Sequence, residues 1–314
     1  MDEKQRHWSA TEERGSSFGI KLLAFVYRYL GRWLCKLLLV PIIFYFYLSG
    51  KVARKASIDY LTKSQANGVN VTPSFWGGFK HFMQFGYSIL DKIDVLINHI
   101  DLDDLVFEGQ EHLDELYNKG QGCILFGSHL GTLEICRTIG RRRRNKRINV
   151  LVSTPHANKI NQLLKNLDPT VDVDLIQVTE FGVDLAIILK ERIELGEMVV
   201  IVGDRTSISN FGRVHYVNFI GHPAPFGEGP FVLAGLLDCP VLLLFCLKDD
   251  SKFKIIFEPF AQTLKYPRKD RKELLDGAIT EYAKRLEYYC GQYPLQWFNF
   301  YDFWLEDSKE KLIK

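Results

Sequence analysis

Cys123-Ile-Leu-Phe-Gly127 is a short, continuously apolar run that is followed at once by the polar residues Ser128 and His129. Such a run, bounded by turn-forming residues, is typical of a strand that is buried on both faces. Comparable runs lie at 148–152, 173–178, 198–202, 241–247 and 253–257. We therefore expect a central sheet that is covered on both sides.

Segments with helical spacing separate these runs. They lie at 131–140, 157–167, 181–195, 227–238 and 270–290. Strands that alternate with helices form mostly parallel sheets, because each return to the sheet crosses over through a helix. The sequence thus predicts the α/β class, with a central, mostly parallel or mixed sheet flanked by helices. No internal repeat or flexible linker interrupts the pattern.

The composition excludes several classes of protein. The chain has 314 residues, of which 46% are hydrophobic and 13% aromatic, and its 40 Lys and Arg nearly balance 38 Asp and Glu. A disordered chain would have few aromatic residues, and a dedicated nucleic-acid binder would be strongly basic. The six cysteines are scattered without a CxxC pair, so we expect reduced, buried thiols, no metal site and no bound cofactor.

Residues 20–50 form an apolar segment that carries cations in its first half. Lys21, Arg28, Arg32 and Lys36 fall within roughly 80° of one helical face. The longest charge-free run, 37–50, is 14 residues, shorter than the roughly 18 to 20 that span a bilayer. We expect a helix anchored in an anionic leaflet, with its cations on the lipid phosphates and Pro41 kinking or breaking it.

Two alternatives to the anchor differ in their support. A secretory signal peptide is disfavoured because the segment is studded with cations and lacks a small-residue cleavage site. An ordinary buried helix stays open. We divide the chain into a polar tail (1–19), the membrane-anchoring helix (20–50), a helical connector (51–105), the main domain (106–305) and a C-terminal tail (306–314).

The strongest chemical signal is Phe126-Gly-Ser-His129-Leu-Gly-Thr-Leu-Glu134. With His129 on the turn after a strand and Glu134 in the first turns of a helix, the two side chains could converge. Glu134 would then accept a hydrogen bond from one imidazole nitrogen and leave the other to take a proton from a hydroxyl. Taken alone the spacing is weak, since a surface histidine would give the same pattern.

This block resembles the His-x4-Asp/Glu block of the lysophospholipid acyltransferase superfamily, in particular its lipid A late (lauroyl/myristoyl) acyltransferase branch. Three later segments follow in that family's order: Val202-Gly-Asp204-Arg205, the glycine-rich stretch 219–234, and Tyr293-Pro-Leu-Gln-Trp297, which is similar to a Pro-x-Gln-Trp signature. The resemblance covers about residues 20–305. It implies a glycerolipid acyltransferase-like fold.

The chain departs from the branch at two places. Arg205 stands where Gln is more common, and Tyr301-Asp-Phe-Trp304 follows the signature where basic residues are usual. These departures affect the expected identity of the acceptor more than the expectation that an acyl group is transferred.

The resemblance implies an enzyme that transfers a fatty acyl group from an acyl thioester, on acyl carrier protein or CoA, to a hydroxyl of a lipid or glycolipid. His129 would be the general base and Glu134 its orienting partner. Asp204 and Arg205 would lie in the substrate-binding site, with the guanidinium of Arg205 on a phosphate, although an Arg–Asp structural pair is the alternative. Gly221, Gly227 and Gly229 would let the backbone approach substrate, or form a plain loop. His222 would contact substrate or have a structural role.

The run after the site is strongly basic. It contains Arg141, Arg142, Arg143 and Arg144. Such a run is often a solvated cluster, but it also suits docking of lipid phosphates or of acidic acyl carrier protein. No nucleic-acid motif accompanies it. Together with the anchor, this predicts an enzyme at the bacterial inner membrane, with the catalytic domain on the cytoplasmic side.

Two other functions stay open from the residues. One is a membrane-bound esterase or thioesterase in which water replaces the acceptor, although a Gly-x-Ser-x-Gly elbow is absent. The other is a lipid-binding protein that keeps the fold without catalysis.

Overall fold

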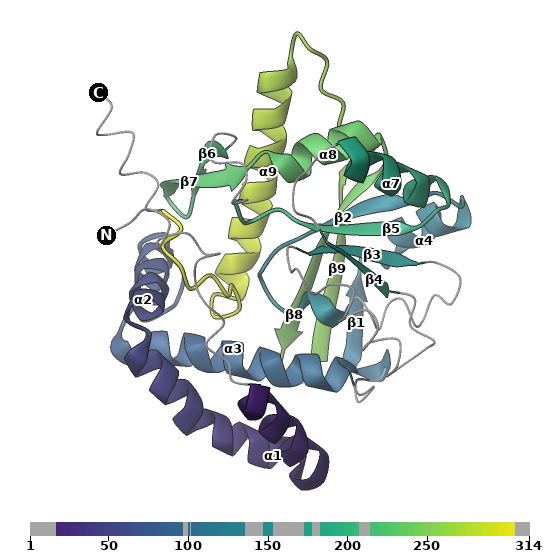
Figure 1. Ribbon diagram of the computed structural model, residues 1–314. Coiled ribbons are helices and arrows are strands. Elements are labelled where there is room, and N and C mark those ends of the chain that lie inside the picture. The colour runs from purple at the N-terminus through teal and green to yellow at the C-terminus, as the bar shows by residue number, and fades with distance from the viewer. Residues whose placement is uncertain are drawn as a thin grey trace. The chain divides into compact units, whose positions relative to one another are not determined.

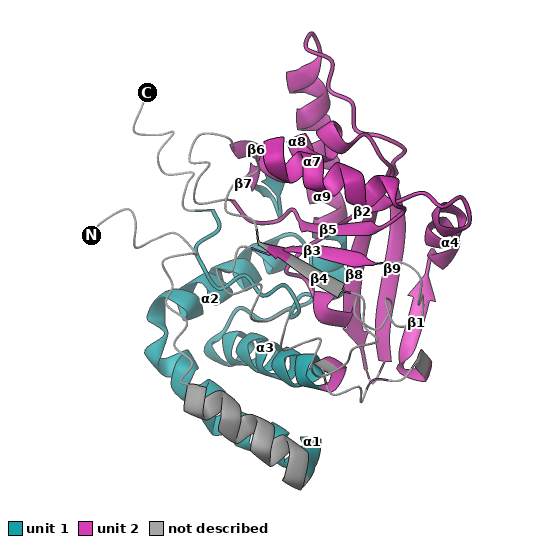
Figure 2. Ribbon diagram, turned by 45° about the vertical axis from the view of Figure 1, so that its right-hand side comes forward, with its two compact units in different colours: residues 1–93, 218–224, 287–314 teal, residues 94–217, 225–286 magenta. Residues whose placement is uncertain are grey.

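The structure is a computed structural model that describes residues 17–96, 100, 102–135, 147–152, 173–177, 183–206, 214–250 and 252–304 (Figure 1). The chain divides into two compact units (Figure 2). Unit 1 comprises residues 1–93, 218–224 and 287–314, and unit 2 comprises 94–217 and 225–286.

Unit 2 is built on a seven-stranded sheet with the order β1-β9-β8-β2-β5-β3-β4. Neighbouring strands are parallel except for the antiparallel pair β8–β9. The α/β class with a mostly parallel mixed sheet is therefore confirmed. The strands are β1 (Leu105–Glu108), β2 (Cys123–Gly127), β3 (Ile148–Val152), β4 (Val173–Gln177), β5 (Met198–Val202), β8 (Val241–Asp249) and β9 (Lys252–Ala261).

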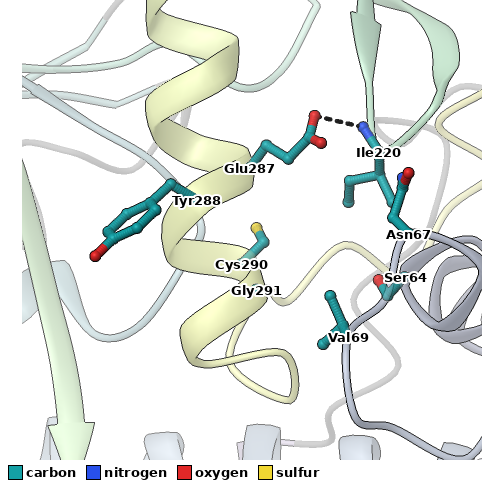
Figure 3. A pocket seen from close by; sticks show the side chains of 8 residues that line it. All are labelled: Ser64, Asn67, Val69, Ile220, Glu287, Tyr288, Cys290 and Gly291. Atoms are coloured by element: carbon teal, nitrogen blue, oxygen red, sulfur yellow. Dashed lines mark hydrogen bonds between the residues drawn. The ribbon is translucent and has the colours of Figure 1, made fainter.

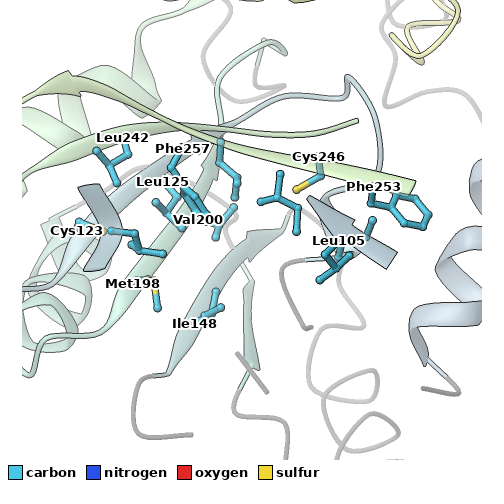
Figure 4. Packing of buried hydrophobic residues seen from close by; sticks show 14 of the residues in the cluster. Leu105, Cys123, Leu125, Ile148, Met198, Val200, Leu242, Cys246, Phe253 and Phe257 are labelled. Atoms are coloured by element: carbon cyan, nitrogen blue, oxygen red, sulfur yellow. The ribbon is translucent and has the colours of Figure 1, made fainter. Parts of the chain in front are cut away.

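The core of unit 2 explains why the predicted strands read as continuous apolar runs. Every residue of β2 is buried, and so are the first seven residues of β8. Alternate residues point to opposite faces of a strand, so both faces of these strands must be covered. On one face Leu125, Val200, Leu242 and Phe257 belong to a single cluster (Figure 4).

The helices of unit 2 follow the predicted alternation in part. They are α4 (Gln110–Asn118), α7 (Val183–Glu194), α8 (Gly229–Leu237) and α9 (Arg271–Gln292), with the short 3₁₀ helices η3 (Leu102–Asp104) and η4 (Leu133–Ile135). The helices expected at 181–195, 227–238 and 270–290 are present. The one expected at 131–140 is a single 3₁₀ turn where the structure describes it, and 157–167 lies outside the described residues.

A hairpin that the sequence did not reveal joins β6 (Val214–Phe219) to β7 (His222–Gly227). Its two-residue turn has positive φ at both Ile220 (52°) and Gly221 (73°), as a type I′ turn requires. Gly221 is thus needed for the turn itself. His222 begins β7 and is exposed.

Unit 1 contains three helices, α1 (Ser17–Ser49), α2 (Lys51–Ala66) and α3 (Phe75–Leu96). We expected Pro41 to kink or break α1, but the helix continues through Pro41 and its backbone leaves the helical region at Gly31, where φ is 81° and ψ is 167°. Glycine alone adopts this conformation without a steric penalty, so Gly31 is the favoured place for the break. Gly31–Ser49 is long and apolar enough to cross a membrane, with a mean hydropathy of 1.5, which is consistent with membrane association.

Of the two cations of the stripe whose side chains the structure describes, Arg32 is half-buried and Lys36 is exposed. Arg32 forms an ion pair with buried Asp91 of α3, and the Lys36 ammonium lies 5.9 Å from the ring centre of Tyr87. Arg32 is therefore held toward α3 by Asp91, while Lys36 remains exposed, and contact of these cations with lipid phosphates stays a prediction. The side chains of Lys21 and Arg28 lie outside the described residues.

The Pro-x-Gln-Trp segment supplies the core of unit 1. Trp297 is fully buried and its ring contacts the rings of Tyr60 and Phe219. Its carbonyl accepts a hydrogen bond from Nε2 of buried His81, 3.0 Å away, so Nδ1 must accept one from the Ser57 hydroxyl at 2.9 Å. Burial lowers the pKa of His81 to about 4, against the opposing effect of the Trp297 bond. His81 is thus a neutral link between the helices and the C-terminal segment.

Candidate functional site

Two adjacent parallel strands bring the main site residues together. Gly127, the last residue of β2, is level with Val202, the last residue of β5. His129 and Asp204 each come two residues later, at the carboxyl edge of the sheet. Ligands of open α/β sheets bind at this edge, because the strands end there and the following turns are free to project side chains.

Asp204 holds His129 through both of its carboxylate oxygens. The Nδ1 atom of His129 lies 2.8 Å from Oδ1, and the backbone N–H of His129 donates to Oδ2 at 2.9 Å. The Asp204 side chain is 1% exposed, whereas that of His129 is 33% exposed. The pair therefore consists of a buried carboxylate and an imidazole that remains accessible.

The electrostatics keep Asp204 ionised. Burial alone would raise the pKa of this carboxyl, but the charge and hydrogen bonds of His129, together with the charge of Arg205, lower it below its usual value. An ionised carboxylate only accepts hydrogen bonds, so Nδ1 of His129 carries the proton of the shared bond. The arrangement selects one imidazole tautomer and orients the ring.

Close packing holds the two strand ends in place. The hydroxyl of Tyr282, on α9, donates to the carbonyl of Gly127 at 2.8 Å, and the N–H of Gly203 donates to the same carbonyl at 3.1 Å. A Cβ at Gly203 would lie 2.9 Å from the Tyr282 ring. Glycine is therefore required immediately before Asp204.

Glu134 lies on a 3₁₀ turn, where we expected the first turns of a helix. It lies in η4 and is exposed, while the carboxylate at Nδ1 of His129 belongs to Asp204. Sequence reasoning assigned Asp204 to substrate and missed this pairing. The signal was present, since both residues follow an apolar strand by two positions, but it needed the knowledge that β2 and β5 are neighbours.

The other candidates divide between the two units. Arg205 is half-buried beside Asp204. Gly227 packs on the same segment, since a Cβ there would lie 3.3 Å from the carbonyl oxygen of Arg205, and Gly229 begins α8. Gly221 and His222 belong to unit 1. Arg141, Arg142, Arg143 and Arg144 lie outside the described residues.

Unit 1 contains a pocket of about 210 Å³ that includes none of the predicted site residues (Figure 3). Within it the carboxylate of Glu287 accepts a hydrogen bond from the backbone N–H of Ile220, at 2.7 Å. This bond supports the hairpin turn. The pocket is lined by Ser64, Asn67, Val69, Ile220, Glu287, Tyr288, Cys290 and Gly291.

The part of the chain that the structure describes contains no cluster of three or more histidine, cysteine and acidic side chains able to hold a metal ion. The chemistry visible at the sheet edge is that of a half-exposed imidazole oriented by a buried carboxylate. Such a group suits proton transfer to or from a hydroxyl or a leaving group.

A comparison with protein families gives a match over residues 81–306, to bacterial lipid A biosynthesis acyltransferases. The chain belongs to this family. The matched range includes the His129–Asp204 pair and the Trp297 segment. A search of curated proteins found no match.

Family membership makes the protein an acyltransferase that acts in lipid A biosynthesis. It implies an acyl donor, a lipid acceptor, and transfer of the acyl group onto a lipid A precursor. The resemblance drawn from the four sequence blocks is thereby confirmed.

Proposed function

We propose that this lipid A acyltransferase family member moves a fatty acyl group from acyl carrier protein to a hydroxyl of a lipid A precursor, with Nε2 of His129 as the general base. The observation that carries the proposal is the 2.8 Å bond between Nδ1 and buried Asp204. Because Nδ1 keeps its proton and donates it in the hydrogen bond to Asp204, the lone pair of the neutral imidazole is at Nε2. CoA is the alternative carrier of the same thioester.

The reaction needs no covalent intermediate on the enzyme. Nε2 takes the proton of the acceptor hydroxyl while its oxygen attacks the thioester carbonyl, which gives a tetrahedral oxyanion. Collapse of this oxyanion forms the ester and breaks the carbon–sulfur bond. The imidazolium then returns its proton to the departing thiolate, and buried Asp204 stabilises the imidazolium in between.

Arg205 and Glu134 have proposed roles beside this pair. The guanidinium of Arg205 suits a phosphate of the donor's pantetheine arm or of the acceptor, and its charge also keeps Asp204 ionised. Glu134 is exposed on the turn that follows His129, so it is the second candidate for orienting the imidazole. Gly227 and Gly229 would admit substrate close to the backbone, and the hairpin residues Gly221 and His222 would contact it.

We further propose a location at the bacterial inner membrane, with the catalytic domain on the cytoplasmic side, where acyl carrier protein and lipid precursors meet. The apolar α1 supports membrane attachment. The basic run from Arg141 to Arg144 would attract the acidic carrier protein by long-range electrostatics.

The decisive experiment incubates purified full-length protein with acylated carrier protein and a lipid A precursor, and weighs the lipid product by mass spectrometry. We expect the acceptor to gain one acyl group, and His129→Ala to slow this by about a hundredfold or more. Undiminished acylation by a folded His129→Ala variant would contradict the proposal. Release of free fatty acid without acylated lipid would indicate a thioesterase instead.

A further inference from the structure

The outward side of α1 between Arg32 and Ser49 is apolar. Trp33 is 75% exposed and Tyr45 66% exposed, and the charge-free part of the helix runs from Leu37 to Ser49. A contiguous apolar face of this length is unusual on a water-exposed helix. The exposed apolar side chains are Trp33, Leu37, Leu38, Val40, Ile42, Tyr45 and Leu48.

The opposite side of the same helix packs on α3. Cys35, Leu39, Ile43 and Tyr47 are buried there in one cluster with residues of α3. Of the two cations of this part of α1, Arg32 points to α3, where it pairs with Asp91, whereas Lys36 is exposed. A helix of a water-soluble protein exposes mainly polar and charged side chains, whereas Lys36 is the one charged side chain on the exposed, otherwise apolar side of α1 between Trp33 and Ser49.

Contacts at both ends show that the two helices lie antiparallel along the whole length of this part of α1. Arg32 meets Asp91 near the end of α3, and the Tyr47 hydroxyl donates to the carbonyl of Phe75 at its beginning, at 2.7 Å. If α1 stood across a bilayer, α3 would have to stand beside it.

The side chains of α3 exclude that arrangement. The helix carries Lys80, His81, Asp91 and Lys92, and His81 is hydrogen-bonded to the carbonyl of Trp297 in the core of unit 1. Ionisable groups at the centre of a bilayer are costly, and α3 is tied to a folded, polar polypeptide. The segment Gly31–Ser49 therefore meets the length requirement for a membrane span without being free to adopt one.

We propose that α1 lies in the plane of one membrane leaflet, with its outward face in the acyl-chain boundary, and does not cross the bilayer. The apolar surface continues past the end of α1, since Val52 and Trp76 are exposed. Tryptophan and tyrosine prefer the level of the lipid headgroups, where an apolar ring and a polar edge are both satisfied.

Charge identifies the partner as an anionic leaflet. From Gly31 to Lys80 the chain carries seven cations and a single acid, Asp59, and two of the cations are paired, Lys63 with Asp59 and Arg32 with Asp91. Cations beside an inserted apolar face add electrostatic attraction to anionic headgroups. The seven cations are Arg32, Lys36, Lys51, Arg54, Lys55, Lys63 and Lys80.

Topology distinguishes the two arrangements. Ser9→Cys and Ser308→Cys each add one thiol, in the N-terminal and the C-terminal tail, and the unaltered chain measures the background from native cysteines. Sealed inverted inner-membrane vesicles that contain each full-length variant are treated with a membrane-impermeant maleimide. We expect both added thiols to react without detergent. If one reacts only after detergent, α1 crosses the membrane and the proposal is wrong.

The face itself is tested by flotation with vesicles of phosphatidylglycerol and phosphatidylethanolamine. Leu37→Asp places a charge on the outward face and should weaken binding by about tenfold or more. Ile187→Asp is the matched control, because Ile187 is 55% exposed on α7 in unit 2, while Leu37 is 56% exposed. Equal binding of the two variants would overturn the proposal, as would an unaltered chain that forms dimers and stays off the vesicles.

These measurements need no acyl donor. A protein that binds vesicles in this way but transfers no acyl group would count against the proposed function and leave the membrane arrangement standing.

Discussion

The buried carboxylate of Asp204 gives His129 its chemical character. A carboxylate that is 1% exposed and bonded twice to the same histidine restricts the imidazole far more than an exposed one, because it has no water to compete for its lone pairs. Glu134 is exposed, so water competes for the lone pairs of its carboxylate. At the scale of single residues, the two carboxylates therefore make different predictions.

Asp204→Asn should lower kcat by about a hundredfold or more, since an amide can present its NH₂ to Nδ1 and so favour the wrong tautomer. Glu134→Gln should retain more activity than Asp204→Asn. Both are measured with saturating acyl donor, after circular dichroism has shown that each variant is folded. A Glu134→Gln variant as impaired as His129→Ala, beside a nearly normal Asp204→Asn, would make Glu134 the orienting residue.

His81 predicts a pH dependence of stability. Its pKa is about 4 in the folded protein and 6.5 when unfolded, so the unfolded chain binds the proton first as the pH falls. Neutral His81 therefore makes its full contribution to the stability of the folded protein above pH 6.5. As the pH falls from about 6.5 to 4, the free energy of unfolding decreases by about 3 kcal/mol. Urea unfolding at pH 7.5 and pH 4.5 measures it.

His81→Gln is the control for this pH effect, because an amide does not titrate in this range. The pH dependence should be smaller in this variant, and an identical fall in both proteins would contradict the assignment. Asp204, whose pKa is lowered by folding, contributes stability that is lost only at lower pH, from its unfolded value near 3.8 downward. The two effects can thus be separated by pH.

At the scale of elements, the site depends on how α9 packs against the ends of β2 and β5. The Tyr282 ring contacts Phe126 and Phe231, while its hydroxyl reaches the Gly127 carbonyl. There is space for this ring only because Gly203 has no side chain. The helix therefore sets the geometry of the turn that carries Asp204.

Gly203→Ala should destabilise the protein by about 1–3 kcal/mol and lower its activity, because the new methyl group displaces Tyr282 and with it the Gly127 bond. Gly277→Ala, on α9, has nothing within 4 Å of its new Cβ and should be neutral or slightly stabilising. Thermal unfolding and kcat of both variants test this. Equal stability of the two variants would show that the close contact between residue 203 and the Tyr282 ring does not determine the stability of the protein.

At the scale of the whole molecule, a net charge of +2 hides local concentrations of charge. Replacing Arg141, Arg142, Arg143 and Arg144 by Gln should raise the KM for acylated carrier protein at low salt with little change in kcat. Salt should diminish the difference, because it screens long-range attraction. Initial rates at several ionic strengths provide the test, and a fall in kcat alone would argue against docking.

The amino-acid sequence by itself determined six strands of the central sheet, the fold class and the family. Runs such as Cys123–Gly127 and Met198–Val202 are apolar throughout because both faces of these strands are buried, and this local pattern can be read without the fold. The same holds for His129, whose place after a strand is a local property. No single block around His129, Asp204 or the glycine-rich stretch identifies the family by itself. The blocks identify it because they occur together and in the family's order.

Tertiary structure alone decided which of these residues meet. Asp204 is 75 positions from His129 and becomes its partner only because β5 pairs with β2 in a register that aligns their ends. The pairing of Arg32 with Asp91 likewise depends on the packing of α1 against α3. The spacing of residues along the chain indicates which face of a strand or helix each one occupies. Which residue lies opposite on that face depends on strand order and helix packing. These are set by contacts between residues that are distant in the sequence.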